Sequence, residues 1–296
     1  MTGRAAIGWA GGALALLLAS YWLFFVRPER ATERARPLQP ETLVLAALSG
    51  GVEIAGPDGH WRAARQGERL SARDRIRTDD AGSAELRAAD GSTVQLSGAT
   101  EARIDELRRE LKRLSLGKGE LAADVRDDPN RVFEVALDDH GAVARTRGAR
   151  FTADADGLGG AAVATRHGEV ILSAGGKEVV IKSGQFARLG AGGVPEAPRP
   201  LPQSLFLKVH WPAATSNRRN LTVSGETTPQ SRVKVAGHYV RVNAEGHYTA
   251  QVELPDGDHE LHVRASDLAG HVVDEKSPKI VVDTTTDFKI QPPKWK

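Results

Sequence analysis

Short alternating runs that end at Asp-Gly turns are the feature that most limits how this chain can fold. Residues 93–96 (TVQL) alternate polar and apolar side chains and follow a turn at Asp90-Gly91. Residues 52–54 (VEI) likewise lead into residues 57–59 (PDG) before Trp61 begins the return. Because glycine tolerates the positive φ of tight hairpins, Asp-Gly between alternating runs is a strong hairpin signal. The pattern predicts an all-β fold for most of the chain.

One stretch near the amino terminus departs from this pattern. Residues 5–26 carry no charge and are rich in Leu, Phe and Trp. About 22 helical residues at ~1.5 Å rise cover ~33 Å, enough for a ~30 Å hydrocarbon core. The sequence therefore predicts a short cytoplasmic start (residues 1–4) and a single transmembrane helix (residues 5–26) that contacts the lipid bilayer. A cleaved signal peptide is the alternative, although the apolar run is long for a signal core.

The charges beside this stretch bear on its orientation. Four arginines lie between residues 27 and 36, whereas Arg4 alone precedes the stretch. Basic residues favour the cytoplasmic side, so this count alone would place the long part of the chain in the cytoplasm. Long domains, however, translocate with little regard to flanking charge. Residues 27–42 are charged and contain proline, and we expect them to form a solvated stalk.

Composition excludes several classes of protein. The 40 Lys and Arg residues are balanced by 38 Asp and Glu, so there is no basic field to attract nucleic acid. Aromatic residues are too few, at 5%, to form base-stacking platforms. The lack of cysteine excludes disulfides, thiol catalysis and Cys-ligated metals. Nucleophile-elbow, phosphate-loop and HExxH motifs are also missing, so we expect no enzymatic activity, no catalytic residues and no cofactor.

Two groups of residues could ligate a metal ion. Asp154 and Asp156 begin like a calcium loop, but the twelfth-position Glu is missing. The last third of the chain holds His210, His238, His247, His259, His262 and His271. Converging imidazoles would bind zinc or copper, but His259 and His262 would face opposite sides of one strand. His262 alternates with apolar neighbours and is expected to face water. Surface histidines are the favoured interpretation, and no metal ligand is predicted.

The segment of residues 101–116 fits two structures. Ile104, Leu107, Leu111 and Leu114 have the spacing of an amphipathic helix. The same residues fit two strands, in which Lys112, Leu114 and Leu116 would share one face and the residues between them the other. Periodicity leaves both structures open.

A series of short motifs in a fixed order resembles a FecR-type domain. They are GV at 51–52, Trp61, GERL at 67–70, DRIRT at 74–78, AEL at 84–86, DGSTVQL at 90–96, LGKGEL at 116–121, PNRVFEV at 129–135, GARFT at 148–152, GEV at 168–170 and GQ at 184–185. Ala149 stands where the family usually has threonine, and Gln185 replaces an acid. The resemblance covers residues 43–189 and implies that residues 101–116 are extended.

The rest of the chain resembles a bacterial Ig-like domain. Residues 190–206 have the Gly and Pro density of a linker, and residues 284–296 form a polar tail. Between them, residues 207–283 hold evenly spaced short runs such as LTVSG at 221–225, LHVRA at 261–265 and DLAG at 267–270. This spacing predicts a small β-sandwich. His271 stands where Ig-like domains usually have asparagine.

Together these features predict a single-pass protein of the bacterial inner membrane with most of its chain in the periplasm. The FecR resemblance decides this orientation over the arginine count. FecR-type regulators are anti-sigma factors with a folded cytoplasmic segment, whereas only residues 1–4 precede the predicted helix, so no sigma-factor-binding segment is expected. The expected function is non-enzymatic binding of an envelope protein in signalling or scaffolding. The alternative is binding of peptidoglycan or polysaccharide, as a cell-wall glycan, by the Ig-like domain.

Overall fold

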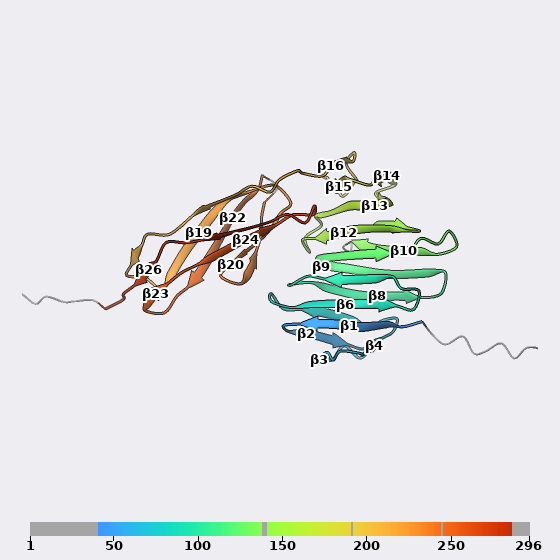
Figure 1. Ribbon diagram of the computed structural model, residues 1–296, viewed down its shortest axis with the longest axis horizontal. Helices are drawn as coiled ribbons and strands as arrows, with labels where there is room; N and C mark the ends of the chain where they lie inside the picture. The colour runs from blue at the N-terminus through green and yellow to red at the C-terminus, as the bar shows by residue number, and fades with distance from the viewer. Residues whose placement is uncertain (1–40, 138–140, 191, 244, 286–296) are drawn as a thin grey trace, which may run out of the picture. The chain divides into compact units, whose positions relative to one another are not determined.

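The computed structural model describes residues 41–137, 141–190, 192–243 and 245–285 (Figure 1). This part of the chain contains 26 strands and no helix, which confirms the all-β prediction. It belongs to one compact unit that begins at Glu41. The predicted transmembrane helix at residues 5–26 and nearly all of the stalk and tail lie outside the described residues. Within them, no helix has the length and hydropathy needed to cross a membrane.

The first region consists of sixteen strands. They are β1 (Leu43–Ser49), β2 (Val52–Ala55), β3 (Trp61–Ala63), β4 (Arg69–Leu70), β5 (Arg75–Thr78), β6 (Ser83–Ala88), β7 (Thr93–Leu96), β8 (Glu101–Leu107), β9 (Leu111–Val125), β10 (Val132–Leu137), β11 (Ala142–Thr146), β12 (Ala149–Ala155), β13 (Ala161–Ala174), β14 (Lys177–Lys182), β15 (Gln185–Arg188) and β16 (Arg199–Pro200). The hairpins predicted at β2–β3 and β6–β7 are present and antiparallel.

These strands form two sheets that share their two longest members. Sheet A runs β4-β1-β6-β7-β9-β12-β13-β15-β16. Sheet B runs β3-β2-β5-β8-β9-β10-β11-β13-β14, and β9–β10 is its one parallel pair. Strand β9 pairs in sheet B through residues 111–118 and in sheet A through residues 119–125. Strand β13 makes the opposite change after residue 168.

Glycines allow both long strands to change sheets. Gly119 in β9 has φ +92°, and Gly168 in β13 has φ +77°. A Cβ at Gly119 would lie 2.4 Å from Thr100 Oγ1, and one at Gly168 would lie 2.4 Å from the Gly148 carbonyl oxygen. A side chain at either position would therefore be excluded both by backbone conformation and by lack of space.

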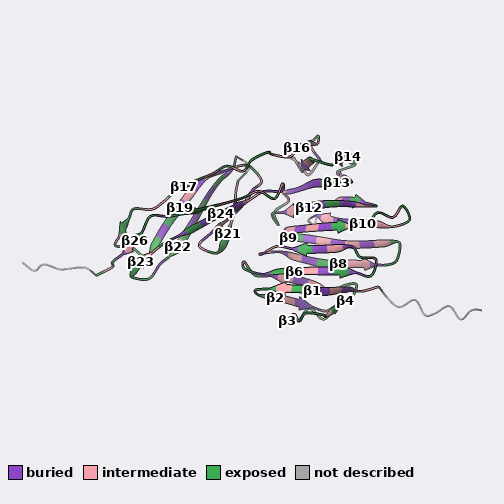
Figure 2. Cartoon of the chain, viewed as in Figure 1, coloured by how far each residue is buried: buried purple, intermediate pink, exposed green. Residues whose placement is uncertain are grey.

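The inner faces of the two sheets enclose one hydrophobic core. Figure 2 shows buried and exposed residues alternating along the strands, as expected for sheets with one face on a core and one in water. The largest buried side chains include Leu45, Leu86, Ile104 and Phe151. The rings of Phe133 and Phe151 meet edge to face with centroids 6.2 Å apart. Each such buried side chain contributes about 1.5–3 kcal/mol.

Residues 101–116 are extended, as the FecR resemblance implies, and the helical interpretation is wrong. They form the hairpin of β8 and the start of β9. Leu114 and Leu116 are buried on the core face, with Lys112 on the same face. The helical spacing has a local cause, since the β8–β9 register shifts between Ile104 and Glu106. Because of this irregularity, Leu107 faces the core three residues after Ile104. In a regular strand, successive residues on one face are two positions apart.

The segment predicted to be an interdomain linker is partly fixed to sheet A. Pro195 forms a bridge with Leu189, and β16 pairs with β15. The Leu201 backbone N–H donates a 2.9 Å hydrogen bond to the Gly184 carbonyl. Glycine and proline density therefore indicated irregular backbone here but not the contacts that hold it.

The second region contains the remaining strands of the unit. They are β17 (Leu207–His210), β18 (Thr215–Ser216), β19 (Asn220–Thr227), β20 (Arg232–Val235), β21 (His238–Val240), β22 (His247–Glu253), β23 (Gly257–His259), β24 (His262–Ser266), β25 (Val272–Lys276) and β26 (Ile280–Val282). They form sheets β17-β19-β22, β21-β20-β24-β25 and β18-β26-β23.

A separate hydrophobic core holds the second region together. It includes Val223, Val233, Val263 and Ile280, each at most 1% exposed. Tyr248 is also buried in it, and burial raises the pKa of its phenol to about 12. Short strands of separate sheets around one such core are consistent with the predicted β-sandwich.

Candidate functional site

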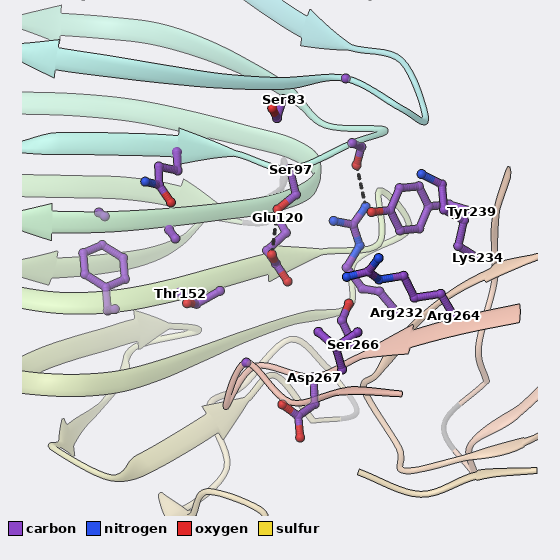
Figure 3. Close-up of a pocket in the computed structure, with 18 of the residues that line it drawn as sticks. Ser83, Ser97, Glu120, Thr152, Arg232, Lys234, Tyr239, Arg264, Ser266 and Asp267 are labelled. Carbon is purple, nitrogen blue, oxygen red and sulfur yellow. Dashed lines mark hydrogen bonds between the residues drawn. The ribbon is translucent and has the colours of Figure 1, made fainter. Parts of the chain in front are cut away.

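A cavity of about 700 Å³ lies between the outer face of sheet A and the second region (Figure 3). Short polar side chains of sheet A line one side, namely Thr93 and Gln95 of β7 and Thr152 of β12. Strands β20, β21 and β24 line the other side. The volume lies within the ~300–1,000 Å³ usual for small-molecule sites, so this cavity is the candidate functional site.

Positive side chains gather on the wall made by the second region. Arg232 and Lys234 alternate with the buried valines of β20, so both point outward toward the cavity. Lys234 pairs in register with Arg264 of β24, which lines the same wall. Like charges directly opposite each other destabilise a sheet. We name Arg232, Lys234 and Arg264 the cation wall.

Neutral groups make most of the contacts to the cation wall. Arg232 Nη2 donates a 2.8 Å hydrogen bond to the Gly98 carbonyl, and Lys234 Nζ donates to the Asp80 carbonyl. The Tyr239 ring lies 4.1 Å from the Arg232 guanidinium carbon and 5.0 Å from Lys234 Nζ. Carbonyl dipoles and an aromatic face attract cations but leave their charge unneutralised.

In the part of the chain that the structure describes, carboxylates lie only at longer range from these cations. Arg232 Nε is 3.7 Å from Asp154 Oδ2, and Arg264 Nε is 3.8 Å from Asp274 Oδ1. Burial raises the pKa of Asp154 to about 7, with Glu120 and Asp156 adding to the rise and Arg232 opposing it. Asp154 is therefore only partly ionised at neutral pH and is a weak counter-ion.

Two loops of sheet A meet β20 and β21 at one edge of the cavity. Asp80 Oδ2 lies 2.8 Å from His238 Nδ1, and the Tyr239 backbone N–H donates to Asp80 Oδ1. Gly98 approaches closely, because a Cβ there would lie 2.4 Å from the Asp80 carbonyl oxygen and 3.0 Å from the Tyr239 ring. The sequence holds no signal for this contact, since its partners are far apart in the chain.

A turn of the second region makes the contact at the other edge. Leu268 is 6% exposed and packs with Ala162, Ala164 and Phe186 of sheet A. The turn is held by His271, whose Nδ1 lies 2.8 Å from Asp267 Oδ2. His271 therefore has a local structural partner at the position where Ig-like domains usually have asparagine.

Two charge clusters inside the first region are made of ion pairs. Lys112 Nζ lies 2.7 Å from Asp90 Oδ2 and 3.2 Å from Glu41 Oε2. Burial would raise the pKa of Asp90, but hydrogen bonds from Lys112 and Ser92 outweigh it and lower the pKa to about 2.

Glu134 has the same kind of environment on sheet B. It lies 2.5 Å from Arg113 and 2.7 Å from Arg145. Its burial opposes ionisation, but the two arginines lower its pKa. Both clusters have the geometry of structural ion pairs.

The residues considered as metal ligands from the sequence are dispersed. Within the described residues, no three His, Cys, Asp or Glu side chains are arranged to hold a metal ion. His262 is exposed on β24, as its alternation predicts, and His259 Nε2 lies 2.7 Å from the Pro255 carbonyl. Asp156 closes its own loop by accepting hydrogen bonds from the Leu158 and Gly160 backbone N–H groups, 2.7 and 2.9 Å away.

The cation wall was missed from the sequence, although a signal for it exists there. Residues 232–235 (RVKV) and 262–265 (HVRA) alternate basic residues with apolar ones. Such alternation places the cations of each strand on a single face. Only the pairing of β20 with β24 brings the two sets together.

The fold and the cavity define an all-β protein of two packed β regions. Residues 74–171 match the family model of the FecR protein, and residues 207–284 match the model of glucodextranase domain B. The FecR resemblance is thus confirmed over residues 74–171, and a second domain match follows it at residues 207–284. No curated protein matches it.

Several solved structures are similar to parts of the chain. A candidate anti-sigma factor from Parabacteroides distasonis ATCC 8503, solved twice, has 17% and 18% sequence identity. In both cases the match covers 48% of this chain and 68% of the other, with a TM-score of 0.39. A polysaccharide lyase has 11% identity, covers 82% of this chain and 40% of its own, and has a TM-score of 0.21. The family models are the basis of the assignment.

Proposed function

We propose that this protein is a non-enzymatic, membrane-anchored FecR-domain protein that binds an envelope protein in the periplasm, in signalling or scaffolding. The FecR match at residues 74–171 is the observation that carries the proposal. The uncharged stretch at residues 5–26 supports the anchor, because its length suits a bilayer-spanning helix. The proposed orientation, with most of the chain in the periplasm, follows from the family resemblance.

The outer face of sheet B supports binding of a protein. Trp61 of β3 lies beneath two arginines of β5, with Arg77 at 4.2 Å and Arg75 at 5.0 Å from the ring centroid. Those arginines also form ion pairs, Arg77 with Glu53 and Arg75 with Glu101. Tryptophan and arginine are the residue types most enriched at the energetic centres of protein interfaces. We name Trp61, Arg75 and Arg77 the Trp-Arg cluster.

A binding experiment with the compact unit tests this proposal. Residues 41–285 are immobilised and offered detergent-solubilised envelope proteins or, separately, purified sacculi. We expect saturable, sugar-independent capture of a protein, weakened at least tenfold by Trp61→Ala and unchanged by Arg218→Gln, an exposed residue of the second region. Capture that is insensitive to Trp61→Ala, or binding to sacculi alone, would contradict the proposal.

Binding of a polysaccharide is the second candidate function. The match of residues 207–284 to a domain of glucodextranase favours it, because that domain's name belongs to an enzyme of polysaccharide breakdown. In the same experiment, saturable binding to sacculi that free glycan competes away would support this function over the first.

A further inference from the structure

The cation wall places three like charges together beside the cavity. Two of its members face each other directly across the β20–β24 ladder, an arrangement that costs stability. Among the described residues, the carboxylates nearest to Arg232 and Arg264 are 3.7 and 3.8 Å away, beyond hydrogen-bond distance. We propose that the cavity binds an anionic saccharide, with its carboxylate or phosphate held against Arg232, Lys234 and Arg264.

The acids that also line the cavity do not cancel this wall. Asp124 is paired with Arg150 at 2.7 Å on sheet A. Asp80 and Asp267 each have a histidine nitrogen at 2.8 Å. Glu120 accepts a 2.7 Å hydrogen bond from Ser97 Oγ. Each of these acids therefore has a partner other than the cation wall.

A fourth cation strengthens the positive field of the cavity. Arg166 of β13 lines it, and no carboxylate within the described residues lies within 4.0 Å of the Arg166 guanidinium. Its Nη2 would be only 2.2 Å from a Cβ at Gly270, so the turn that carries Leu268 packs closely over it. Guanidinium groups bind carboxylate and phosphate in a planar, bidentate manner.

The opposite side of the cavity indicates that the ligand also carries hydroxyl groups. Thr93, Gln95 and Thr152 present hydroxyl and amide groups from three positions on sheet A. In Figure 3, Thr152 lies across the cavity from Lys234, Tyr239 and Arg264. A cavity of about 700 Å³ is much larger than a single inorganic anion needs. One end of the ligand would contact the cations and the rest would form hydrogen bonds with these polar groups.

Both faces of the cavity are needed for such a ligand, which makes this inference more specific than glycan binding by the Ig-like domain alone. It rests on the polysaccharide-binding candidate for its ligand class and does not depend on the Trp-Arg cluster. Loss of protein capture on Trp61→Ala would therefore leave it intact, and failure of saccharide binding would leave protein capture intact.

Isothermal titration of the full chain in detergent at low salt tests the inference. The probes are tetragalacturonate, glucose 6-phosphate, inorganic phosphate and neutral maltotetraose. We expect saturable binding of an acidic saccharide and no detectable binding of maltotetraose. Tighter binding of tetragalacturonate indicates that the ligand is part of an acidic polymer, whereas tighter binding of glucose 6-phosphate indicates that it is a free sugar phosphate. Binding of inorganic phosphate as tight as that of both saccharides, or of none of the probes, would overturn the inference.

Variants separate ligand binding from a structural role. Lys234→Gln and Arg264→Gln should each weaken binding of the acidic saccharide about tenfold, as expected for loss of one charge-assisted hydrogen bond. Gln95→Ala should weaken saccharide binding a few-fold and leave phosphate binding unchanged. Arg218→Gln is the matched control, an exposed arginine that does not line the cavity. Equal affinity in Lys234→Gln, Arg264→Gln and the control would contradict the assignment.

Discussion

The buried ion pairs of the first region and the cation wall of the second region differ in how their charges are balanced. In the first region, buried Lys112 lies against Asp90 and Glu41, and buried Glu134 lies between two arginines. In the second region, Lys234 faces Arg264 on the same ladder, and neutral carbonyls make the closest contacts. An ion pair inside a sheet helps to stabilise the fold. Like charges that face each other beside a cavity instead indicate a binding surface for an anion.

Removal of a paired charge should have the largest effect on stability. Asp90→Ala leaves Lys112, whose side chain is 5% exposed, with Glu41 as its remaining carboxylate. Breaking a buried pair costs about 3 kcal/mol of unfolding free energy. Chemical denaturation would measure this loss. Asp258→Ala is the control because its pair with Lys279 is well exposed, and it should cost under about 1 kcal/mol.

The same pair predicts how stability depends on acid. The pKa of Asp90 is about 2 in the fold against an ordinary 3.8, so it contributes stability above pH 4. That contribution, about 2 kcal/mol, is lost as the pH falls through 2. Between pH 2 and pH 5, the unfolding free energy measured by chemical denaturation should rise more steeply with pH in the natural protein than in Asp90→Ala. Identical slopes would show that Asp90 does not couple to folding.

Asp154 should show the opposite pH dependence. Its pKa is raised to about 7, mainly by burial, so stability is greatest below pH 4 and falls as the pH rises through 7. Asp154→Asn removes this titration while keeping the shape of the side chain. The Tm of the natural protein should fall between pH 5 and pH 8 more than that of Asp154→Asn. An equal fall in both proteins would contradict the assignment of this slope to Asp154.

The cation wall should contribute least to stability. Lys234→Gln relieves repulsion with Arg264 but loses a hydrogen bond to the Asp80 carbonyl and the attraction of the Tyr239 ring. Because these effects oppose one another, the unfolding free energy should change by less than about 1 kcal/mol. Measured beside Asp90→Ala, this variant sharpens the comparison between the two regions. A loss of several kcal/mol of unfolding free energy would show that the cation wall serves mainly to stabilise the fold.

The sequence predicted the local elements well because their causes are local. Asp-Gly turns and alternating residues correctly located the hairpins around Trp61 and Asp90. The helical spacing in residues 101–116 misled because a register shift places Leu107 back on the core face. The cavity could not be predicted, since it depends on contacts such as Arg232 with Gly98, 134 residues apart. Contacts between residues so far apart produce no periodic pattern in a single sequence.

Binding of an envelope protein requires the compact unit to lie outside the cytosol, which a reporter fusion tests most directly. Alkaline phosphatase, which is active only in the periplasm, is fused behind Lys296 in a bacterium and compared with a β-galactosidase fusion at the same position. We expect the phosphatase fusion to be active and to fractionate with the inner membrane. An active β-galactosidase fusion with an inactive phosphatase fusion, or a mature product free in solution, would contradict a membrane-anchored periplasmic protein.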